Sequence, residues 1–413
     1  MRIGNVDVKE LVRDYQTPLY VYDEGKIKSV VKEFKDNFKS DNFSTDVLFA
    51  CKALDCLYMY NLANKLGLCL DCVTGGEIYG AYKAGFNMKN VFFHGNNKSE
   101  DEILMAGKYG VGNIIIDNLD EVKMLEEVLK DTDYHFNVMM RINIGVSAHT
   151  HQYIITAHPD SKFGFFIESE DIFTAVEMIK KNKNLSFKGF HSHIGSQIFD
   201  KEGFLIAVSK LFGLMAKFDF EFEWLNLGGG FGIKYTDEDK PIPYDEVSKM
   251  LIDKVNEEMK STGIKISRLL IEPGRSIVGE AGYTLYTIGQ LKKTKNKMYY
   301  FIDGGMSDNI RPALYQAKYA CDVVDKESSE KKNLVCIAGK CCESGDVIIE
   351  DILLPEAKKN DILVVYSTGA YGYSMSSNYN KMLKPAMVFV DNGNVKLACK
   401  RQSYDDLYAN EEI

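Results

Sequence analysis

A TIM-like (β/α)8 barrel followed by a mostly β domain is the α/β fold that this sequence predicts, and three observations support it. Eight short, nearly all-apolar runs lie between residues 45 and 272, and segments with helical spacing separate them. After Gly279 the pattern changes to strand-like runs divided by turn signals. Short continuous apolar runs are typical of parallel strands that are buried on both faces. Eight β–α units in about 230 residues match a barrel of ordinary size.

The predicted elements follow the chain in order. The eight barrel strands are residues 47–50, 68–70, 91–93, 114–116, 138–140, 187–190, 224–227 and 269–271, and examples of helical segments are 103–107 and 121–129. Later strands are predicted at residues 283–290, 298–302, 334–338, 347–354, 362–366 and 387–398. We therefore expect a barrel domain over 26–279. A β-rich domain is expected from 1–25 and 280–413, because the run at 18–22 has the character of a strand.

Composition and charge restrict the class of protein. The chain has 413 residues, of which 45% are hydrophobic and 26% charged, and a net charge of −9. This acidic balance disfavours a nucleic-acid partner or an anionic membrane surface. No run approaches the roughly 18 apolar residues of a membrane span, and the first residues lack the apolar core of a signal peptide. We therefore expect a cytoplasmic protein.

The cysteines point to reduced thiols and to no metal site. There are nine, an odd number, and without a signal peptide a reducing compartment is the better interpretation. Cys69 and Cys72 have the CxxC spacing, but no second CxxC or histidine pair lies at zinc-ribbon distance. Buried thiols at a strand end are the favoured account of this pair.

Residues able to do chemistry follow most of the predicted barrel strands. In such barrels the active site forms at the carboxyl ends of the strands. Reading those ends in order gives Lys52, Asp71, His94, Asp117, Arg141, His193, Gly228 and Glu272. A barrel mouth lined by lysine, histidine and glutamate is therefore our candidate site.

Lys52 closes the first run. A lysine at a strand end is usually only a solvated charge. Desolvation and neighbouring cations can, however, lower the pKa of an amine until it bonds covalently to an aldehyde. That interpretation requires an aldehyde cofactor, so the other motifs must supply one.

Gly228, Gly229 and Gly230 follow the seventh run. Glycines let backbone N–H groups close on a phosphate, whereas a tight turn is the simpler alternative. The spacing is not the GxGxxG dinucleotide pattern. Barrels commonly hold phosphate in the loops after strands 7 and 8, which favours phosphate here, and Ser196 after strand 6 could add a hydroxyl.

Glu272 and His193 complete a set of groups that suits pyridoxal phosphate. A carboxylate against a pyridine nitrogen keeps that nitrogen protonated, so the ring can accept electrons. The alternative for Glu272 is an ion pair with Arg275. His193 could stack on the ring face, although a lone histidine is more often a core residue, and His191 on the same strand could only support it.

Four motifs in this order resemble the fold-type III pyridoxal phosphate decarboxylases, whose barrel is alanine racemase-like: Ala50-Cys51-Lys52-Ala53, His191 to Gln197 (HSHIGSQ), Gly228 to Gly232 (GGGFG) and Glu272 to Arg275 (EPGR). The resemblance covers nearly the whole chain and is closest to the diaminopimelate decarboxylase subfamily. It implies that Lys52 carries the cofactor, that His193 stacks on it, and that Glu272 meets the pyridine nitrogen. It also implies that Gly228 to Gly230, with Ser196, hold the phosphate, with Arg275 close by.

The β-rich part resembles the same subfamily in residues 306–315, 342–346 and 369–372. The resemblance implies meso-diaminopimelate as substrate and L-lysine and CO2 as products. Arg275, Arg311 and Tyr315 would hold its distal carboxylate, Glu343 its distal ammonium, and Tyr371 would contact cofactor and substrate. Cys342 would donate the proton that replaces CO2. In this family the Cys-Glu-Ser segment belongs to the partner subunit's site, which implies a homodimer with shared active sites.

A few departures and alternatives remain. Leu54, Lys340 and the run Gln316-Ala317-Lys318 differ from the usual pattern, and the last lies next to Tyr315. A decarboxylase of basic amino acids or of carboxynorspermidine is the main alternative, and Arg311 argues against it because an amine-ended substrate offers no carboxylate. A catalytically inactive cofactor-binding homologue and an amino-acid racemase are weaker alternatives. The segment from His149 to Phe165 also resembles the subfamily and is expected to be a mobile loop without a catalytic role.

Overall fold

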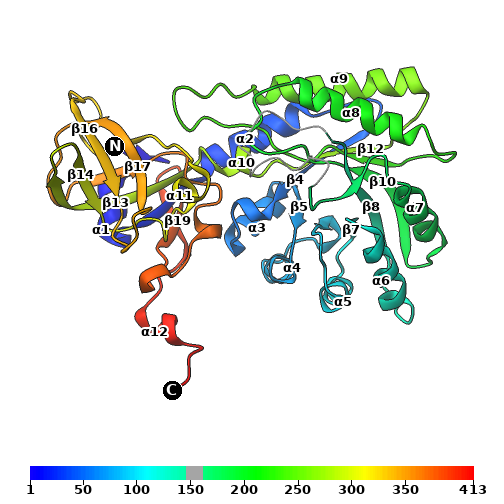
Figure 1. Ribbon diagram of the computed structural model, residues 1–413, viewed down its shortest axis with the longest axis horizontal. Helices are drawn as coiled ribbons and strands as arrows, with labels where there is room; N and C mark the ends of the chain where they lie inside the picture. Colours follow the sequence, from blue (N-terminus) through cyan, green and yellow to red (C-terminus); the bar gives the residue numbers. More distant parts are fainter. Residues whose placement is uncertain (146–160) are drawn as a thin grey trace. The chain divides into compact units, whose positions relative to one another are not determined.

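The computed structural model describes residues 1–145 and 161–413, which divide into two compact units (Figure 1). The barrel unit comprises residues 30–232 and 241–274, and the β unit comprises residues 1–29, 233–240 and 275–413. The part of the expected loop that contains His149 and His151 lies outside the described residues.

The barrel unit is built on a closed parallel sheet. Its strand order is β10-β11-β12-β4-β5-β6-β7-β8, and pairing of β10 with β8 closes the circle. The strands are β4 (Ser44–Ala50), β5 (Cys69–Cys72), β6 (Val91–Phe93), β7 (Asn113–Ile116), β8 (Phe136–Asn143), β10 (Leu185–His191), β11 (Trp224–Asn226) and β12 (Arg268–Ile271). The short β9 (Phe165–Phe166) pairs in parallel with the end of β8. The eight-stranded barrel predicted from the apolar runs is confirmed.

Helices connect successive barrel strands. They are α3 (Leu57–Lys65), α4 (Gly75–Lys83), α5 (Glu100–Tyr109), α6 (Leu119–Leu129), α7 (Asp171–Lys181), α8 (Glu202–Met215) and α9 (Tyr244–Thr262), with α2 (Glu24–Asn37) leading into the barrel. Thr74, Ser99 and Asn118 cap α4, α5 and α6 by accepting a backbone N–H through their side chains. These polar caps start each helix soon after a strand ends.

The barrel core explains why the runs are apolar on both faces. Strands β5, β6 and β7 are buried at every position. One apolar cluster takes a residue from seven of the eight strands, as expected of a layer of side chains: Leu48, Cys69, Phe92, Ile115, Met139, Leu270 and, packed against it, Trp224. Cys69 and Cys72 are both buried.

The β unit is a seven-stranded path in the order β17-β16-β14-β13-β3-β19-β20, with β18 pairing to β13 and β15 pairing to β18. The strands are β3 (Leu19–Asp23), β13 (Gly282–Lys293), β14 (Met298–Ile302), β15 (Cys321–Val323), β16 (Asn333–Ala338), β17 (Val347–Leu354), β18 (Ile362–Val365), β19 (Ala386–Asp391) and β20 (Asn394–Cys399). The hairpin β1 (Arg2–Ile3) and β2 (Val6–Asp7) and the helices α1 (Val8–Tyr15), α10 (Arg275–Val278), α11 (Arg311–Tyr315) and α12 (Tyr404–Tyr408) complete it.

Pairing in the β unit joins distant parts of the chain. β3 lies between β13 and β19, so the run at 18–22 forms a strand of this sheet as expected. Two apolar clusters lie along β13, one against β14, β16 and β17 and the other against α1 and β19. β15 was not predicted because three residues are too few for a recognisable alternation. No helix among the described residues is both long and apolar enough to cross a membrane.

A buried ion pair fixes two loops at the carboxyl end of the barrel. Lys98 Nζ donates to Gly95 O (2.8 Å), Ile115 O (2.7 Å) and Glu121 Oε1 (2.7 Å), while Glu121 Oε2 accepts from the Asp117 N–H (2.8 Å). The Lys98 and Glu121 side chains are 0% and 4% exposed. Because all three lysine donors are used, the pair holds the loops that follow β6 and β7.

We expect Lys98→Met to lower the free energy of unfolding of the barrel by about 3 kcal/mol, because it leaves a buried carboxyl group without its cation. Urea denaturation at pH 7 measures this. The control is Lys123→Met, which removes an exposed lysine paired with exposed Asp120 and should leave the midpoint nearly unchanged. Equal midpoints for the two variants would contradict the structural role of Lys98.

Candidate active site

The residues that follow the barrel strands meet at one end of the barrel unit. Lys52 lies in the 3-10 helix η1 (Cys51–Ala53) directly after β4, and Glu272 directly follows β12. Lys52 is exposed, whereas Glu272 is buried with 6% of its surface exposed. The charges of both act on the imidazole of His193. The structure therefore gathers an amine, a carboxylate and an imidazole around one space.

Three nitrogen atoms surround the Glu272 carboxylate. Asn226 Nδ2 donates to Oε1 (2.7 Å), and His94 Nε2 lies 3.1 Å from the same oxygen. His191 Nε2 donates to Oε2 (3.1 Å). The two histidine rings meet edge to face with their centroids 5.0 Å apart. Each partner stands at the end of a different strand, so barrel closure itself assembles this group.

This environment keeps Glu272 ionised. Burial by itself would raise the pKa of the Glu272 carboxyl, but His191 and His94 outweigh burial and hold that pKa well below its usual range. Burial also lowers the pKa of His191 in spite of the neighbouring carboxylate. The result is a buried anion held by an amide and two imidazoles.

His193 lies beyond β10 and is linked to the glycine loop. Its Nδ1 accepts the N–H of Gly229 (3.2 Å), which leaves the ring proton on Nε2. Loss of solvation, with the positive charges of Lys52 and Arg141, lowers the pKa of His193 well below its usual value. A neutral imidazole with a fixed ring plane is therefore present.

The glycine loop can exist only with glycine. An added Cβ would lie 2.4 Å from Ser192 O at Gly228, 2.1 Å from Glu272 O at Gly229 and 2.3 Å from Gly195 O at Gly230. Gly228 and Gly230 also have positive φ angles of 66° and 104°. The glycine loop packs closely on the loop that contains Ser196 and Ile198. Ile198 N in that loop donates a hydrogen bond to Gly230 O (2.9 Å).

Two of the three glycine N–H groups already have acceptors. Gly228 N donates to Asn226 Oδ1 (2.9 Å) and Gly229 N donates to His193 Nδ1. Within the described residues no acceptor meets the N–H of Gly230. Of the donors expected for a phosphate, only the Gly230 N–H and the neighbouring Ser196 therefore stay candidates. Gly228 and Gly229 shape the loop instead.

Pyridoxal phosphate fits this set of groups. The set offers an exposed amine, an ionised buried carboxylate, a neutral imidazole and a glycine loop without side chains. The ligand atoms of His94, His191 and Glu272 also lie within 4.8 Å of one another, a spacing that could hold a metal ion. The short contacts of the carboxylate with its two histidines account for this spacing without an ion.

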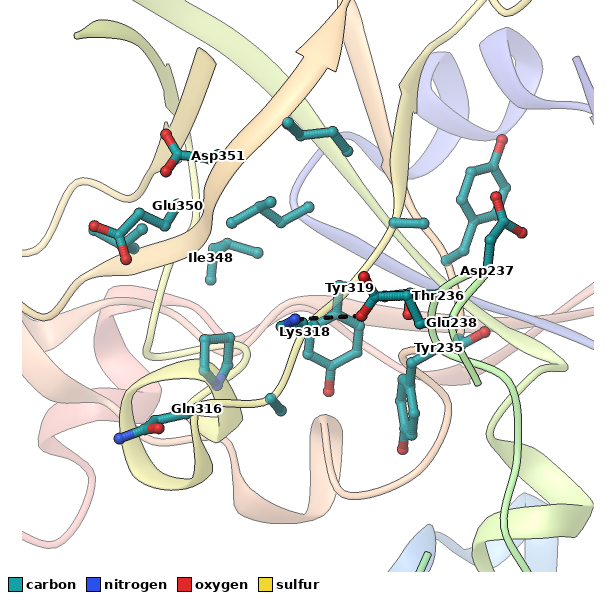
Figure 2. A pocket seen from close by; sticks show the side chains of 18 of the residues that line it. Tyr235, Thr236, Asp237, Glu238, Gln316, Lys318, Tyr319, Ile348, Glu350 and Asp351 are labelled. Atoms are coloured by element: carbon teal, nitrogen blue, oxygen red, sulfur yellow. Dashed lines mark hydrogen bonds and ion pairs between the residues drawn. The ribbon is translucent and has the colours of Figure 1, made fainter. Parts of the chain in front are cut away.

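The β unit contains a second group, built from two arginines and their tyrosines. Arg311 Nη1 donates to the hydroxyls of Tyr235 (3.0 Å) and Tyr319, and Arg275 Nη1 donates to Tyr235. The Arg275 guanidinium also lies 4.8 Å from the ring centroid of Tyr371. Both arginines are buried, at 7% and 6% exposure. Tyrosine hydroxyls and rings therefore hold two buried cations, and two of these tyrosines, Tyr235 and Tyr319, also line the cavity in Figure 2.

The remaining predicted residues lie at the surface of the β unit. Tyr315 ends α11 and is partly buried, and Tyr371 has a positive φ of 62°. Cys342 and Glu343 are exposed; Cys342 N donates to Asn380 Oδ1 (2.7 Å), and Glu343 Oε1 accepts from Gly345 N (3.3 Å). All nine cysteines lie in the described residues, and Cys342 is the only exposed one.

The sequence did not identify four residues of these two groups as partners of the predicted site residues: His94, Asn226, Tyr235 and Tyr319. His94 stood at a strand end, but nothing in the sequence tied it to Glu272, and Asn226 looked like part of an apolar strand. Tyr235 and Tyr319 carried no motif at all. Asn226 and His94 lie 46 and 178 positions from Glu272, and Tyr235 lies 76 positions from Arg311, so periodicity could not find these partners. Tyr319 lies only 8 positions from Arg311, but no motif marks it.

Comparisons with known proteins show which family has this fold and this set of residues. The family model described as "Pyridoxal-dependent decarboxylase, pyridoxal binding domain" matches residues 24–279. The diaminopimelate decarboxylase of Bacillus subtilis is 46% identical, over 98% of this chain and 94% of the relative. The crystal structure of diaminopimelate decarboxylase from M. jannaschii in complex with L-lysine has a TM-score of 0.93 and 33% identity, covering 98% of this chain and 94% of that one. Lysine/ornithine decarboxylase from Vibrio vulnificus has a TM-score of 0.77 at 20% identity, which shows the fold alone.

The barrel and its donor set thus define a pyridoxal phosphate-dependent decarboxylase of fold type III. Within that class, the chain belongs to the diaminopimelate decarboxylase family.

The buried histidine predicts a pH dependence of stability. The pKa of His191 is lower in the folded protein than in the unfolded chain, so below about pH 6.5 only the unfolded chain takes up the proton. Stability is therefore complete above pH 6.5 and decreases below it, with a slope of at most about 1.4 kcal/mol per pH unit from this group. We expect the slope between pH 6.5 and 5 to be smaller in His191→Gln, measured by urea denaturation of the cofactor-free protein. The exposed His135 supplies the control His135→Gln, which should keep the wild-type slope; equal slopes for all three proteins would contradict the prediction.

Proposed function

We propose that this protein decarboxylates meso-2,6-diaminopimelate to L-lysine and CO2 as the last step of lysine biosynthesis. The observation that carries the proposal is the pair of buried arginines, held by tyrosine hydroxyls, in a chain that also has the complete donor set for pyridoxal phosphate. A pyridoxal phosphate-dependent decarboxylase needs the donor set for the cofactor. A substrate with a second carboxylate needs the pair of arginines. The 46% identity to a diaminopimelate decarboxylase supports the same reaction.

Residues of the barrel unit hold the cofactor in this proposal. Lys52 would hold the cofactor through its aldehyde carbon, and His193 would pack on the ring. Ser196 and the Gly230 N–H would receive the phosphate in the loop that Gly228 and Gly229 shape. When bound, pyridoxal phosphate supplies an electron-accepting ring that stabilises the negative charge left by the departing CO2. Glu272 keeps a proton on the ring nitrogen, because its own pKa is held low by His191 and His94. Asn226 and the two histidines orient that carboxylate.

The β unit binds the other end of the substrate. Arg311 and Arg275, with Tyr315, hold the distal carboxylate, and Tyr371 contacts cofactor and substrate. The bidentate fork of an arginine suits a planar carboxylate, and the tyrosine hydroxyls restrict the guanidinium of Arg311 to one orientation. Only two residues separate Glu272 from Arg275 in the chain, which supports one site served by both units.

A second copy of the chain completes the site. The partner's Glu343 binds the distal ammonium, and the partner's Cys342 donates the proton from Sγ to the carbon that has lost CO2. The exposure of Cys342 and Glu343 supports their reaching beyond their own chain. The proposed assembly is therefore a homodimer with shared active sites. We place it in the cytoplasm, in keeping with nine cysteines, all described, that form no disulfide bond.

The alternative is decarboxylation of a basic amino acid or of carboxynorspermidine. The fold alone permits it, because the Vibrio vulnificus enzyme shares the fold. The fixed guanidinium of Arg311 argues against it, since an amine-ended substrate would place a second cation beside this one.

Substrate assays test the reaction. We expect the protein loaded with pyridoxal phosphate to form CO2 and lysine from meso-diaminopimelate, and no CO2 from L-ornithine or D-lysine. Lys52→Ala should lower kcat by about 10⁴-fold or more, and Arg311→Met should raise KM about 100-fold because one carboxylate loses its buried cation. CO2 from the monocarboxylate amines, or an unchanged KM in Arg311→Met, would contradict the proposed substrate.

Complementation between inactive variants tests the shared site. Co-expression of differently tagged Lys52→Ala and Cys342→Ala chains gives mixed dimers in which one of the two sites has both native residues. We expect the mixed population to recover about one quarter of the wild-type activity, because half of the dimers are mixed and half of their sites are intact. Activity no higher than that of the separate variants would mean that each site uses the cysteine of its own chain.

A further inference from the structure

The C-terminal arm, which we define as residues 403–413, is ordered but buries nothing. It contains α12, a five-residue helix closed by a capping box in which Ser403 Oγ accepts the Asp406 N–H (3.2 Å) and Asp406 Oδ2 accepts the Ser403 N–H (2.7 Å). No residue of α12 is buried, and Tyr404 and Tyr408 are 72% and 51% exposed. Figure 1 draws α12 apart from the strands of its own unit.

The base of the arm is firmly attached. Gln402 N donates to Lys384 O (3.1 Å), and Gln402 Oε1 accepts from Lys384 N (2.9 Å) and Asn378 Nδ2 (2.6 Å). Further along, Lys381 Nζ pairs with Glu411 (2.7 Å) and lies 4.3 Å from the Tyr408 ring centroid. The arm therefore leaves the β unit in a set direction.

A helix of five residues is not stable on its own in water, because its nucleation cost exceeds what so few hydrogen bonds return. Most helical stability in proteins comes from packing of an apolar face. Within the described residues Tyr404 stays 72% exposed, and Tyr408 stays 51% exposed although Lys381 lies on its ring. Exposed aromatic side chains on a short, capped helix are thus expected to pack on another molecule.

The barrel unit carries an exposed surface that matches the arm. The α4–α5 tyrosine face, which we define as Tyr79, Tyr82, Lys83, Lys108 and Tyr109, lies at the carboxyl ends of those helices. Tyr79 and Tyr82 are 47% and 52% exposed, and Tyr82 stacks on Tyr109 with centroids 4.3 Å apart. Lys83 lies 6.0 Å from the Tyr79 ring centroid and Lys108 lies 5.8 Å from that of Tyr109. Neither lysine has a carboxylate partner among the described residues, so both charges are available.

Charge favours this pairing. The arm has four acidic side chains and no basic one: Asp405, Asp406, Glu411 and Glu412. A cavity of about 1040 Å³ in the β unit is unsuitable for such an arm, because five acidic residues line it against two lysines: Asp237, Glu238, Glu280, Glu350 and Asp351 against Lys234 and Lys318 (Figure 2). The tyrosine face offers two lysines and aromatic rings instead.

We propose that the C-terminal arm of one chain docks on the α4–α5 tyrosine face of a second copy of the same chain. In a two-fold dimer the contact is made twice, arm to face and face to arm, so that both exposed surfaces of each copy are covered. The acidic start of α5, Glu100 to Glu102, lies at the opposite end of that helix and directs the arm to the lysine end. This inference rests on the homodimer of the proposed function and adds to it an interface remote in sequence from the reacting groups.

Sedimentation velocity of the enzyme loaded with pyridoxal phosphate, at low salt and decreasing concentration, tests the docking. We expect a chain that ends at Gln402 to show a dimer dissociation constant raised about tenfold or more, because aromatic burial and ion pairs are both lost. Lys83→Glu with Lys108→Glu should weaken the dimer, and Asp405→Lys with Glu412→Lys, which leave the capping box intact, should do the same. The four changes together in one chain should restore the constant to within about threefold of wild type, because attraction replaces repulsion. The control, Lys249→Glu with Lys260→Glu in α9, reverses two exposed charges elsewhere and should leave the constant unchanged.

An unchanged dissociation constant in the truncated chain would overturn the docking, as would a four-change chain no tighter than its two-change parents. Docking of the arm on its own chain would leave the constant insensitive to all of these variants, and so would also overturn it. Complementation of Lys52→Ala by Cys342→Ala reports separately on the shared site. A dimer that complements but ignores the arm would leave the proposed function intact.

Discussion

The buried carboxylate of Glu272 is the constraint on which the barrel end of this molecule depends. A charge with 6% of its surface exposed must be compensated, and Asn226, His94 and His191 compensate it. These partners follow or end strands β11, β6 and β10, so the anion is satisfied only when the sheet has closed into a barrel. The same network reaches the glycine loop, because Asn226 Oδ1 also accepts the Gly228 N–H. Compensation of the buried charge and closure of the barrel are therefore one structural requirement.

The buried charges of the two units have opposite signs. The barrel unit presents an ionised carboxylate held by histidines, whereas the β unit presents buried guanidinium groups among tyrosines. Tyrosine hydroxyls satisfy the donors of Arg311 without neutralising it, and its pKa remains raised despite burial because Tyr235 and Tyr319 surround it. Among the described residues no carboxylate pairs with Arg311, and a cation that stays charged in this way is suited to an anionic group of a substrate. In the proposed reaction, one unit thus holds the cofactor and the other selects the second carboxylate.

Two ordered segments of the chain are unusually exposed to solvent: the loop that contains Cys342 and the C-terminal arm. Eight of the nine cysteines are buried or partly buried, and Cys342 alone is exposed, next to exposed Glu343. Asp346 fixes this segment by accepting from Cys341 N (2.7 Å) and Met306 N (2.6 Å), so its exposure belongs to an ordered loop. The C-terminal arm shows the same combination of order and exposure. Both features are explained by a second copy of the chain, which the proposed dimer provides.

The sequence by itself determined the eight apolar runs, the change to β structure after Gly279, and the motifs that contain Lys52, His193, Gly228 to Gly230 and Glu272. These signals are local, because strand burial and turn chemistry are recorded in neighbouring residues. Only the tertiary structure decided that His94 and Asn226 hold Glu272, that the Gly228 and Gly229 N–H groups are already bonded, and that Tyr235 and Tyr319 hold Arg311. Four of these six contacts join residues that are at least 36 positions apart in the chain. Their partners are chosen by barrel closure and sheet pairing, which no local pattern records.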